Sequence, residues 1–239
     1  MKLYKTIMAI KFFTFDSPAA AATALAHDSA AALQAGCAAR NQASLVVSGG
    51  RSPIAFFNAL ATQPLPWAQI GVTLADERWV APDSADSNER LVRAELLQRA
   101  AQAAQFVPLK ALGVAPDGCL AERWQAVAAL AQPFDFVVLG MGDDAHTASL
   151  FPGSLGLAAA MDVSAVPALV SMQPLVAPYA RISFNLVALL RSKQIALLMQ
   201  GGAKREVYER AIANMDALSA PIGAVLRQHS VPVSVYWSP

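Results

Sequence analysis

The chain has 239 residues, of which 55% are hydrophobic and 15% charged, with a formal net charge of +1. This composition favours a tightly folded globular protein and gives neither a basic face for nucleic acid nor an acidic tail. No window approaches the roughly 18 uninterrupted apolar residues of a transmembrane helix, so we expect small-molecule partners and no membrane contact. Residues 1–239 are ample for one domain with a real core.

The N-terminus, MKLYKTIMAIKFF, lacks the long apolar region and small-residue cleavage site of a secretory signal. Met8 is a candidate for the natural start, because the first convincing strand begins near Ile10. Cys37 and Cys119 lie far apart in helical contexts and form no CxxC pair, which predicts buried reduced thiols. Reduced thiols suit the cytoplasm, where we expect the protein.

Short apolar runs alternate with helical segments along the chain. The predicted strands are Ile10–Phe15, Ser44–Val47, Ile70–Leu74, Phe106–Pro108, Phe134–Leu139, Ala168–Ser171, Arg181–Phe184, Gln194–Met199 and Val231–Trp237. The predicted helices are Pro18–Arg40 (capped by Ser17), Pro53–Ala61, Asn88–Ala100, Leu120–Ala131, Leu186–Arg191, Ala203–Ala213 and Pro221–Gln228. This alternation predicts a largely parallel α/β sheet wrapped on both sides. Ligands of such folds bind outside the carboxyl ends of the strands, so the loops after strands should carry function.

The first of four unusual loops is SLVVSGGRSPIAFF. Ser52 and Pro53 resemble the N-cap and first residue of a helix. Free backbone N–H groups at Gly49 and Gly50, beside a helix N-terminus, are typical of an anion site. Arg51 adds a fork of donors suited to phosphate. A tight turn with a solvated arginine is the alternative, and the loop is not a Walker A motif, which needs GxxxxGK[ST].

The second loop, VTLADERWVAPDSADSNERL, places three charges directly after a buried strand. Burying Asp76, Glu77 and Arg78 is costly unless they are paired or used. We predict a functional role for Asp76 and Arg78, in which the arginine orients a carboxylate while its other donors face a substrate. Glu77 is predicted to form a surface salt bridge, and Ser87 to cap a helix that begins at Asn88.

The third loop is GMGDDAHTASLFPG, from Gly140 to Gly153. Its G-x-G-x-x-A pattern after a strand imitates a dinucleotide fingerprint, with Asp162 near the expected acidic position. That fingerprint should open a helix, but Pro152 and Gly153 break the chain within one or two turns, and no strand precedes Asp162. A Rossmann cofactor site is therefore not favoured.

His146, in this third loop, admits three interpretations. A metal ligand would need companions, but His27 and His229 lie far away in helical stretches, and no ligand spacing is present. A structural histidine satisfied by hydrogen bonds is the second interpretation. The third is a general acid or base, because an imidazole exchanges protons near neutral pH. Asp143 or Asp144 could then hold the ring in the required tautomer.

The fourth loop, LLMQGGAKREVYERA, has Gly201 and Gly202 after a strand and Lys204 in the first turn of a helix. A cation is slightly unfavourable there because of the helix dipole. Lys204 is therefore predicted to bind a phosphate or carboxylate, with a solvated side chain as the alternative. Arg181, at the start of the RISFN strand, is a weaker candidate for the same role.

A serine-hydrolase arrangement is a minor alternative. Ser48, Asp76 and His146 follow the Ser–Asp–His chain order of α/β-hydrolases. However, VVSGG lacks the first glycine of the G-x-S-x-G elbow. The glycine and proline that follow make a phosphate loop the simpler interpretation of Ser48.

Together these loops resemble the 6-phosphogluconolactonases, which share a superfamily with glucosamine-6-phosphate isomerase/deaminase. The matching motifs are SGGRSP (Ser48–Pro53), DERWV with SN (Asp76–Val80, Ser87–Asn88), GMGDDAHTASLFPG (Gly140–Gly153), RIS (Arg181–Ser183), GGAK (Gly201–Lys204) and the terminal VSVYW. They occur in the family order over nearly the whole chain, and HTASLFPG is the most specific. The deaminase branch typically reads DEY and DGHIAFNEP where this sequence has DER and DAHTASLFP, which favours the lactonase branch.

The resemblance implies hydrolysis of 6-phospho-D-glucono-1,5-lactone to 6-phosphogluconate, the second step of the pentose phosphate pathway, without a metal or organic cofactor. It implies a three-layer α/β sandwich with a mostly parallel, Rossmann-like sheet and a small antiparallel addition, as a monomer or weak homodimer. His146 would activate water, and Asp144 would position its loop. Arg78 would stabilise the oxyanion, and Asp76 would orient Arg78 or a sugar hydroxyl. The implied substrate-binding residues are Ser48, Gly49, Gly50, Arg51, Ser52, Asn88, Thr147, Arg181 and Lys204, with Gly49, Gly50, Arg51 and Lys204 on the phosphate.

Two residues depart from the family pattern. Ala145 stands where a glycine is usual between the aspartate and the histidine, and its side chain disfavours a positive φ. Ser52 replaces the more usual threonine but keeps the hydroxyl. Three alternatives to the lactonase remain: a sugar-phosphate deaminase or isomerase, a serine esterase, and a non-catalytic sugar-phosphate binder.

Overall fold

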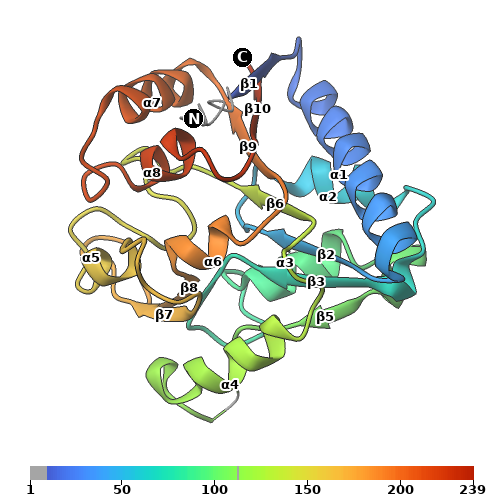
Figure 1. The fold of residues 1–239 in the computed structure, drawn as a ribbon, viewed down its shortest axis with the longest axis horizontal. Helices are drawn as coiled ribbons and strands as arrows, with labels where there is room; N and C mark the ends of the chain where they lie inside the picture. Colours follow the sequence, from blue (N-terminus) through green and yellow to red (C-terminus); the bar gives the residue numbers. More distant parts are fainter. Residues whose placement is uncertain (1–9, 112) are drawn as a thin grey trace, which may run out of the picture.

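A computed structural model describes residues 10–111 and 113–239, so the suggested start at Met8 lies outside the described residues. Seven parallel strands form the main sheet, in the order β1-β10-β9-β6-β2-β3-β5 (Figure 1). These strands are β1 (Lys11–Thr14), β2 (Ala43–Val47), β3 (Ile70–Leu74), β5 (Gln105–Val107), β6 (Phe136–Leu139), β9 (Ile195–Gln200) and β10 (Val233–Ser238). A small antiparallel sheet contains β4 (Asp76–Arg78), β8 (Arg181–Phe184) and β7 (Leu169–Met172). The predicted three-layer α/β class with a small antiparallel addition is therefore confirmed.

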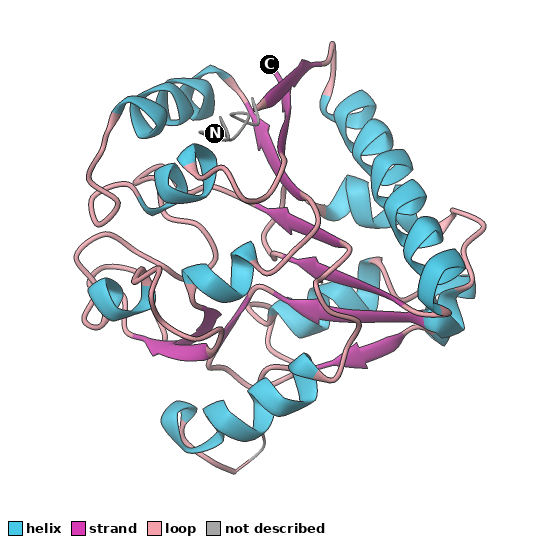
Figure 2. Cartoon of the chain, in the orientation of Figure 1, coloured by secondary structure: helices cyan, strands magenta, loops and turns pink. Residues whose placement is uncertain are grey.

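The helices surround the main sheet (Figure 2). They are α1 (Pro18–Arg40), α2 (Ile54–Ala61), α3 (Asn88–Glu95), α4 (Pro116–Ala128), α5 (Leu157–Ala160), α6 (Leu186–Leu190), α7 (Gly202–Ala213) and α8 (Pro221–Arg227). Short 3-10 turns cover Trp67–Gln69 and Arg99–Ala103. Helix α1 runs along one flank of the sheet and contacts β2, β6, β9 and β10 (Figure 1). In the described part of the chain, no helix combines the length and apolar character needed to cross a membrane.

Local signals explain most helix boundaries. Ser17 caps α1 as predicted, since its side chain accepts a hydrogen bond from the Ala20 N–H at 3.2 Å. Helix α3 ends earlier than predicted, and Arg99 beyond it has a φ of +54°, which a helix cannot continue through. Helix α4 begins earlier than predicted, at Pro116, a favoured first helical residue.

The strand order creates a switch point between β2 and β6. From β2 the chain adds β3 and β5 on one side, then returns to place β6, β9 and β10 on the other side. The connections that leave β2 and β6 therefore diverge, which opens a crevice at their carboxyl ends. All strand pairs of the main sheet are parallel, so the loops after β3 and β9 meet at the same edge.

The opposite edge of the sheet is closed by a buried carboxylate, Asp135. Its oxygens accept hydrogen bonds from Arg40 at the end of α1, at 2.6 Å, and from the Ser44 N–H of β2 at 2.9 Å. Lys193, just before β9, lies 2.8 Å from the same carboxylate. The Asp135 carboxylate, just before β6, therefore links α1, β2 and the start of β9 through hydrogen bonds and ion pairs.

We expect Asp135→Asn to lower the free energy of unfolding by about 2–3 kcal/mol, because two cations lose their partner at a buried site. Urea denaturation measures the change. Asp83→Asn, at an exposed loop position, is the matched control and should change stability by less than about 0.5 kcal/mol. Equal stability for the two variants would show that the Asp135 cluster does not stabilise the fold.

Candidate active site

The four loops singled out in the sequence meet in one cavity of about 240 Å³ at the carboxyl ends of β2, β6 and β9. The predicted site residues on its wall are Ser48, Gly49, Gly50, Ser52, Asp76, Arg78, Asn88, His146, Arg181 and Lys204. The end of β6 with the segment after it (Val138 to Gly142), the end of β9, Pro53 and Ala148 also line the cavity. The switch point of the sheet is thus the place where the predicted residues converge.

The glycine loop after β2 lies against Asn88. A Cβ atom at Gly49 would fall 1.9 Å from Asn88 Oδ1, so only glycine allows this approach. Gly50 has a φ of +99°, a second position that favours glycine. The loop turns here and presents its backbone to the cavity.

The start of α2 differs from the prediction. The helix begins at Ile54, Pro53 occupies the N-cap position, and no side chain caps the helix. The Ser52 side chain is exposed rather than turned back on the helix, so the predicted Ser52 cap is wrong. The Arg51 side chain is also exposed, and Arg51 does not form part of the cavity wall.

The charged triplet after β3 is a strand, β4, which the sequence analysis did not predict. It pairs with β8 so that Asp76 lies opposite Ser183 and Arg78 opposite Arg181. Side chains alternate along a strand, so Asp76 and Arg78 share one face while Glu77 points to the other. The first face lines the cavity.

Two arginines therefore lie directly opposite each other on the cavity wall. Like charges in this cross-strand position repel, and an anion between them would relieve the repulsion. Burial lowers the pKa of Arg181, and the Arg78 charge lowers it further, against the opposing effect of the Asp76 charge. Each guanidinium is tethered to a backbone carbonyl: Arg78 donates to Asp86 at 2.7 Å and Arg181 to Pro178 at 3.2 Å. The pair is suited to holding an anionic group.

Asp76 is held by a residue that the sequence analysis missed, Ser149. The Ser149 hydroxyl donates to Asp76 Oδ2 at 2.5 Å, and the Ser149 N–H donates to Ser183 Oγ at 3.1 Å. Ser149 is fully buried and links the His146 loop to the small sheet. Its position within HTASLFPG was the only sequence signal available.

Glu77 is the clearest correction to the sequence analysis. Its side chain is fully buried, so the predicted surface position is wrong, and its ion pair with Lys110, at 3.7 Å, lies away from water. Because β4 turns this side chain away from the cavity, Glu77 instead meets the N-terminus of α3, where Ser87 and the backbone of Asn88 donate to it. The predicted cap is confirmed, since Ser87 Oγ accepts from the Arg90 N–H at 3.3 Å.

The imidazole of His146 is oriented by Asp144. Its Nδ1 lies 2.5 Å from Asp144 Oδ1, and its backbone N–H donates to the same oxygen at 3.1 Å. A Cβ at Gly142 would fall 2.1 Å from Nδ1, so glycine is needed there. The Phe151 ring packs on the imidazole with centroids 4.0 Å apart. These contacts occupy Nδ1 and leave Nε2 as the nitrogen that can exchange a proton.

The charge of the Asp144 carboxylate is supported by this contact. Partial burial would raise its pKa, but the hydrogen bond and charge of His146 outweigh burial and lower the pKa below its ordinary value. Asp143, the other candidate partner, instead forms an ion pair with Lys204 at 2.8 Å. Lys204 Nζ also donates to the Met141 carbonyl at 2.6 Å, which places its ammonium beside the His146 loop.

Thr147 does not reach the cavity. Its side chain is fully buried, and its hydroxyl donates to the Gly140 carbonyl at 2.9 Å, inside the loop. The hydroxyl therefore fastens the loop, and its predicted contact with substrate has no support in this geometry. Asp144 contacts His146 but does not line the cavity itself.

Two of the alternative sites can be compared with the geometry. In the serine-hydrolase order Asp76 would orient His146, but His146 pairs with Asp144 and Asp76 with Ser149. Between Gly140 and Gly156 the chain forms turns and no helix, unlike a dinucleotide fingerprint. Within residues 10–111 and 113–239, no group of three or more His, Cys, Asp or Glu side chains is arranged to hold a metal ion.

The fold and the cavity define an α/β enzyme for a small anionic substrate, with cations and an imidazole–carboxylate pair at the switch point of a parallel sheet. The chain belongs to the family of glucosamine-6-phosphate isomerases/6-phosphogluconolactonase, whose sequence profile matches residues 16–237. A 6-phosphogluconolactonase from Rhizobium meliloti is 40% identical over 232 residues, covering 97% of this chain and 100% of the relative. One from Pseudomonas putida is 42% identical, covering 94% of this chain and 90% of the relative. The crystal structure of a 6-phosphogluconolactonase from Shewanella baltica superposes with a TM-score of 0.92 at 42% identity, covering 98% of this chain and 99% of that one.

Ala145 adopts a left-handed backbone conformation, and a glycine is usual at this position in the family pattern. Its φ is +63°, and Ala148 in the same loop has a φ of +48°. A left-handed alanine costs about 1–2 kcal/mol, whereas a glycine at the same position loses about 0.5–1 kcal/mol more chain entropy on folding. The strain of the left-handed alanine is therefore larger than the extra entropy cost of a glycine.

We therefore expect Ala145→Gly to raise the free energy of unfolding by about 0.5–1 kcal/mol, measured by urea denaturation. Ala31→Gly, at an exposed interior position of α1, is the control and should lower it by about 1 kcal/mol. A loss of stability at both positions would mean that Ala145 is not strained.

Proposed function

We propose that the chain hydrolyses 6-phospho-D-glucono-1,5-lactone to 6-phospho-D-gluconate, the second step of the oxidative pentose phosphate pathway. The observation that carries the proposal is His146, whose Nδ1 is held by Asp144 while its ring lines a cavity with three cations. Relatives with 40% and 42% identity over almost the whole chain bear the name 6-phosphogluconolactonase. A lactone is an activated ester, so a positioned water and a base are sufficient for its hydrolysis.

The charges on the cavity wall suit a phosphorylated substrate. The wall carries three cations, Arg78, Arg181 and Lys204, and one carboxylate, Asp76. Lys204 is also paired with Asp143 outside the wall, at 2.8 Å. Lys204 and the backbone N–H groups of the glycine loop would hold the phosphate, with Arg181 assisting. Arg51, outside the wall, could reach a phosphate only from the rim of this loop.

The reaction would proceed through a tetrahedral intermediate. His146 Nε2 accepts a proton from water as the water oxygen bonds to the lactone carbonyl carbon. The carbonyl oxygen becomes an oxyanion, which Arg78 stabilises by preference. When the carbonyl re-forms, the bond to the ring oxygen breaks and His146 returns its proton to that oxygen, giving the C5 hydroxyl. The new carboxylic acid then ionises, and Asp144 stabilises the transient imidazolium throughout.

Substrate hydroxyls would meet the remaining wall. Asn88 Oδ1 and Ser48 Oγ are buried and have no hydrogen-bond partner among the described residues. A buried polar atom without a partner carries a desolvation cost that a ligand hydroxyl would relieve. Asp76, fixed by Ser149, would accept from another hydroxyl or orient Arg78, although no hydrogen bond joins Asp76 and Arg78 within the described residues.

We further propose that the enzyme works in the cytoplasm, as a monomer or weak homodimer. Cys37 and Cys119 are both buried free thiols, which suits a reducing compartment. The wall residues assigned to the reaction meet in one cavity of a single chain, which supports a monomer or weak homodimer.

His146→Ala should lower turnover above the spontaneous rate by about 10²–10⁴-fold, because the water loses its base. The dissociation constant for 6-phosphogluconate should change by less than about threefold, since the phosphate contacts remain. The assay uses freshly made lactone, because its spontaneous hydrolysis is appreciable. His27→Ala, exposed on α1, is the matched control. Near-normal turnover of His146→Ala would remove this histidine from the mechanism, and ammonia release from glucosamine 6-phosphate by the wild type would favour the deaminase.

Lys204→Ala should raise KM by about 10–100-fold, the loss expected for one charge-assisted hydrogen bond, while kcat falls only a few-fold. Steady-state kinetics separate the two constants. Lys11→Ala, exposed on β1, controls for the loss of a surface charge. A large fall in kcat at unchanged KM would instead place Lys204 at the oxyanion.

A further inference from the structure

We infer that Glu77 is a positioning residue for this site: its buried carboxylate fixes the first turn of α3 and so holds the Asn88 carboxamide on the cavity wall. The inference rests on the proposed function, because it gives Asn88 a substrate hydroxyl to bind. Glu77 itself lies on the far face of β4 and does not line the cavity. It can therefore act on substrate only through its neighbours.

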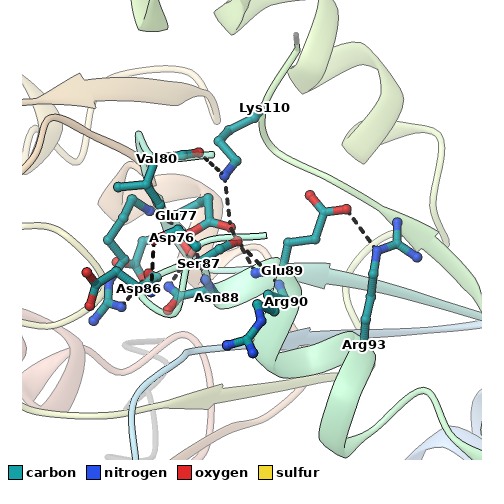
Figure 3. A network of polar contacts seen from close by, with 12 residues as sticks. Asp76, Glu77, Val80, Asp86, Ser87, Asn88, Glu89, Arg90, Arg93 and Lys110 are labelled. Carbon is teal, nitrogen blue, oxygen red and sulfur yellow. Dashed lines mark hydrogen bonds and ion pairs between the residues drawn. The ribbon is translucent and has the colours of Figure 1, made fainter. Parts of the chain in front are cut away.

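The Glu77 carboxylate is saturated with donors from the start of α3 (Figure 3). Oε1 accepts from the Asn88 N–H at 2.8 Å, and Oε2 from Ser87 Oγ at 3.0 Å and the Glu89 N–H at 2.8 Å. The first N–H groups of a helix have no partner within the helix, and its dipole favours a negative charge there. One carboxylate thus fixes three successive residues, of which the middle one faces the cavity.

Two further contacts hold the carboxylate from the strand side. The Arg78 N–H donates to Oε1 at 2.7 Å, so the backbone of a second cavity residue is fixed by the same group. Lys110 Nζ lies 3.7 Å from Oε2 and donates to the Val80 carbonyl at 2.8 Å. The side chains of Glu77 and Lys110 are 0% and 7% exposed, so this ion pair is formed away from water. Moving the carboxylate would break contacts on both sides at once.

Asn88 connects Glu77 to the cavity, because its backbone N–H binds Glu77 and its side chain lies on the cavity wall. Its Nδ2 donates to the Asp76 carbonyl at 2.9 Å, which leaves Oδ1 as the atom that faces the glycine loop. Asn88 is only 2% exposed, and Oδ1 has no hydrogen-bond partner in the described part of the chain. The carboxamide spans β4 and the loop after β2, so a shift of the α3 turn would move the acceptor away from the substrate.

Asp135 offers a matched comparison for a merely structural role. It is a buried carboxylate with cationic partners and a backbone N–H donor, as Glu77 is, but it lies at the opposite edge of the sheet. If Glu77 only stabilised the fold, Glu77→Gln and Asp135→Asn would have the same effect on activity. A positioning role predicts that they differ.

The experiment measures kcat/KM for 6-phosphogluconolactone well below the unfolding temperature of each variant. We expect Glu77→Gln to lower kcat/KM at least tenfold, because an amide cannot accept from all the donors of α3. Asp135→Asn should leave kcat/KM within about twofold of the wild type when both are folded. Equal effects of the two substitutions would overturn the inference.

A double-mutant cycle tests whether the effect passes through Asn88. In an Asn88→Ala background, Glu77→Gln should cost clearly less than in the wild type, because the side chain through which it acts on substrate is gone, and only its contact with the Arg78 backbone remains. Full additivity would overturn the inference. Should Glu77→Gln fail to fold, Ser87→Ala replaces it in the same cycle, since it removes one hydrogen bond to Glu77 and leaves the carboxylate in place. We then expect Ser87→Ala to lower kcat/KM in the wild type and to lower it less in the Asn88→Ala background, and full additivity would again overturn the inference.

A failure of the Glu77 positioning role can be distinguished from a failure of the proposed lactonase function. If the wild type hydrolyses the lactone no faster than the spontaneous reaction, the proposed function fails. The Glu77 cycle is then measured as the affinity for 6-phosphogluconate by calorimetry, with the same non-additivity expected. Unchanged affinity and unchanged kcat/KM in Glu77→Gln would reject the positioning role while leaving the lactonase assignment intact.

Discussion

The parallel register of the main sheet is the constraint on which the site depends. Because all seven strands run the same way, every loop that leaves a carboxyl end arrives at one edge, and the reversal of order at β2 and β6 keeps these loops apart. The resulting cavity collects side chains from four loops that together span more than a hundred residues of sequence, from Ser48 to Lys204. None of them could form a site within its own segment.

Placing so much charge at a buried edge creates an electrostatic cost that the fold meets with fixed donors rather than with solvent. Asp76 is held by a buried serine hydroxyl and Glu77 by the start of α3, whereas Asp144, which orients the His146 imidazole, is half exposed. The antiparallel strand β4 sorts these groups by its alternation: Asp76 and Arg78 toward the cavity, Glu77 toward the helix that supports it. Neighbouring residues of β4 therefore have different roles: Asp76 and Arg78 face the cavity, and Glu77 supports the helix beside it.

The elements with a strong local signal could be predicted from the sequence, and those that depend on distant partners could not. The apolar strands and the Ser17 cap follow from local composition, so the sheet and α1 matched closely. Strand β4 was missed because three consecutive charges do not look like a strand until β8, about a hundred residues later, pairs with them. The burial of Glu77 was missed for the same reason. Ser149 and Phe151 gave no signal beyond their motif, and the exposure of Arg51 depends on how the glycine loop turns, which spacing does not reveal.

In the proposed reaction, this edge of the sheet binds a phosphate while the lactone attached to it is hydrolysed. A direct test compares the wild-type rates above the spontaneous background for 6-phosphogluconolactone and for gluconolactone without the phosphate. We expect a large acceleration for the first and a kcat/KM lower by about 10³-fold or more for the second, since binding energy at the phosphate positions the reacting carbonyl. Equal acceleration of both lactones, or none of the phosphorylated one, would contradict it.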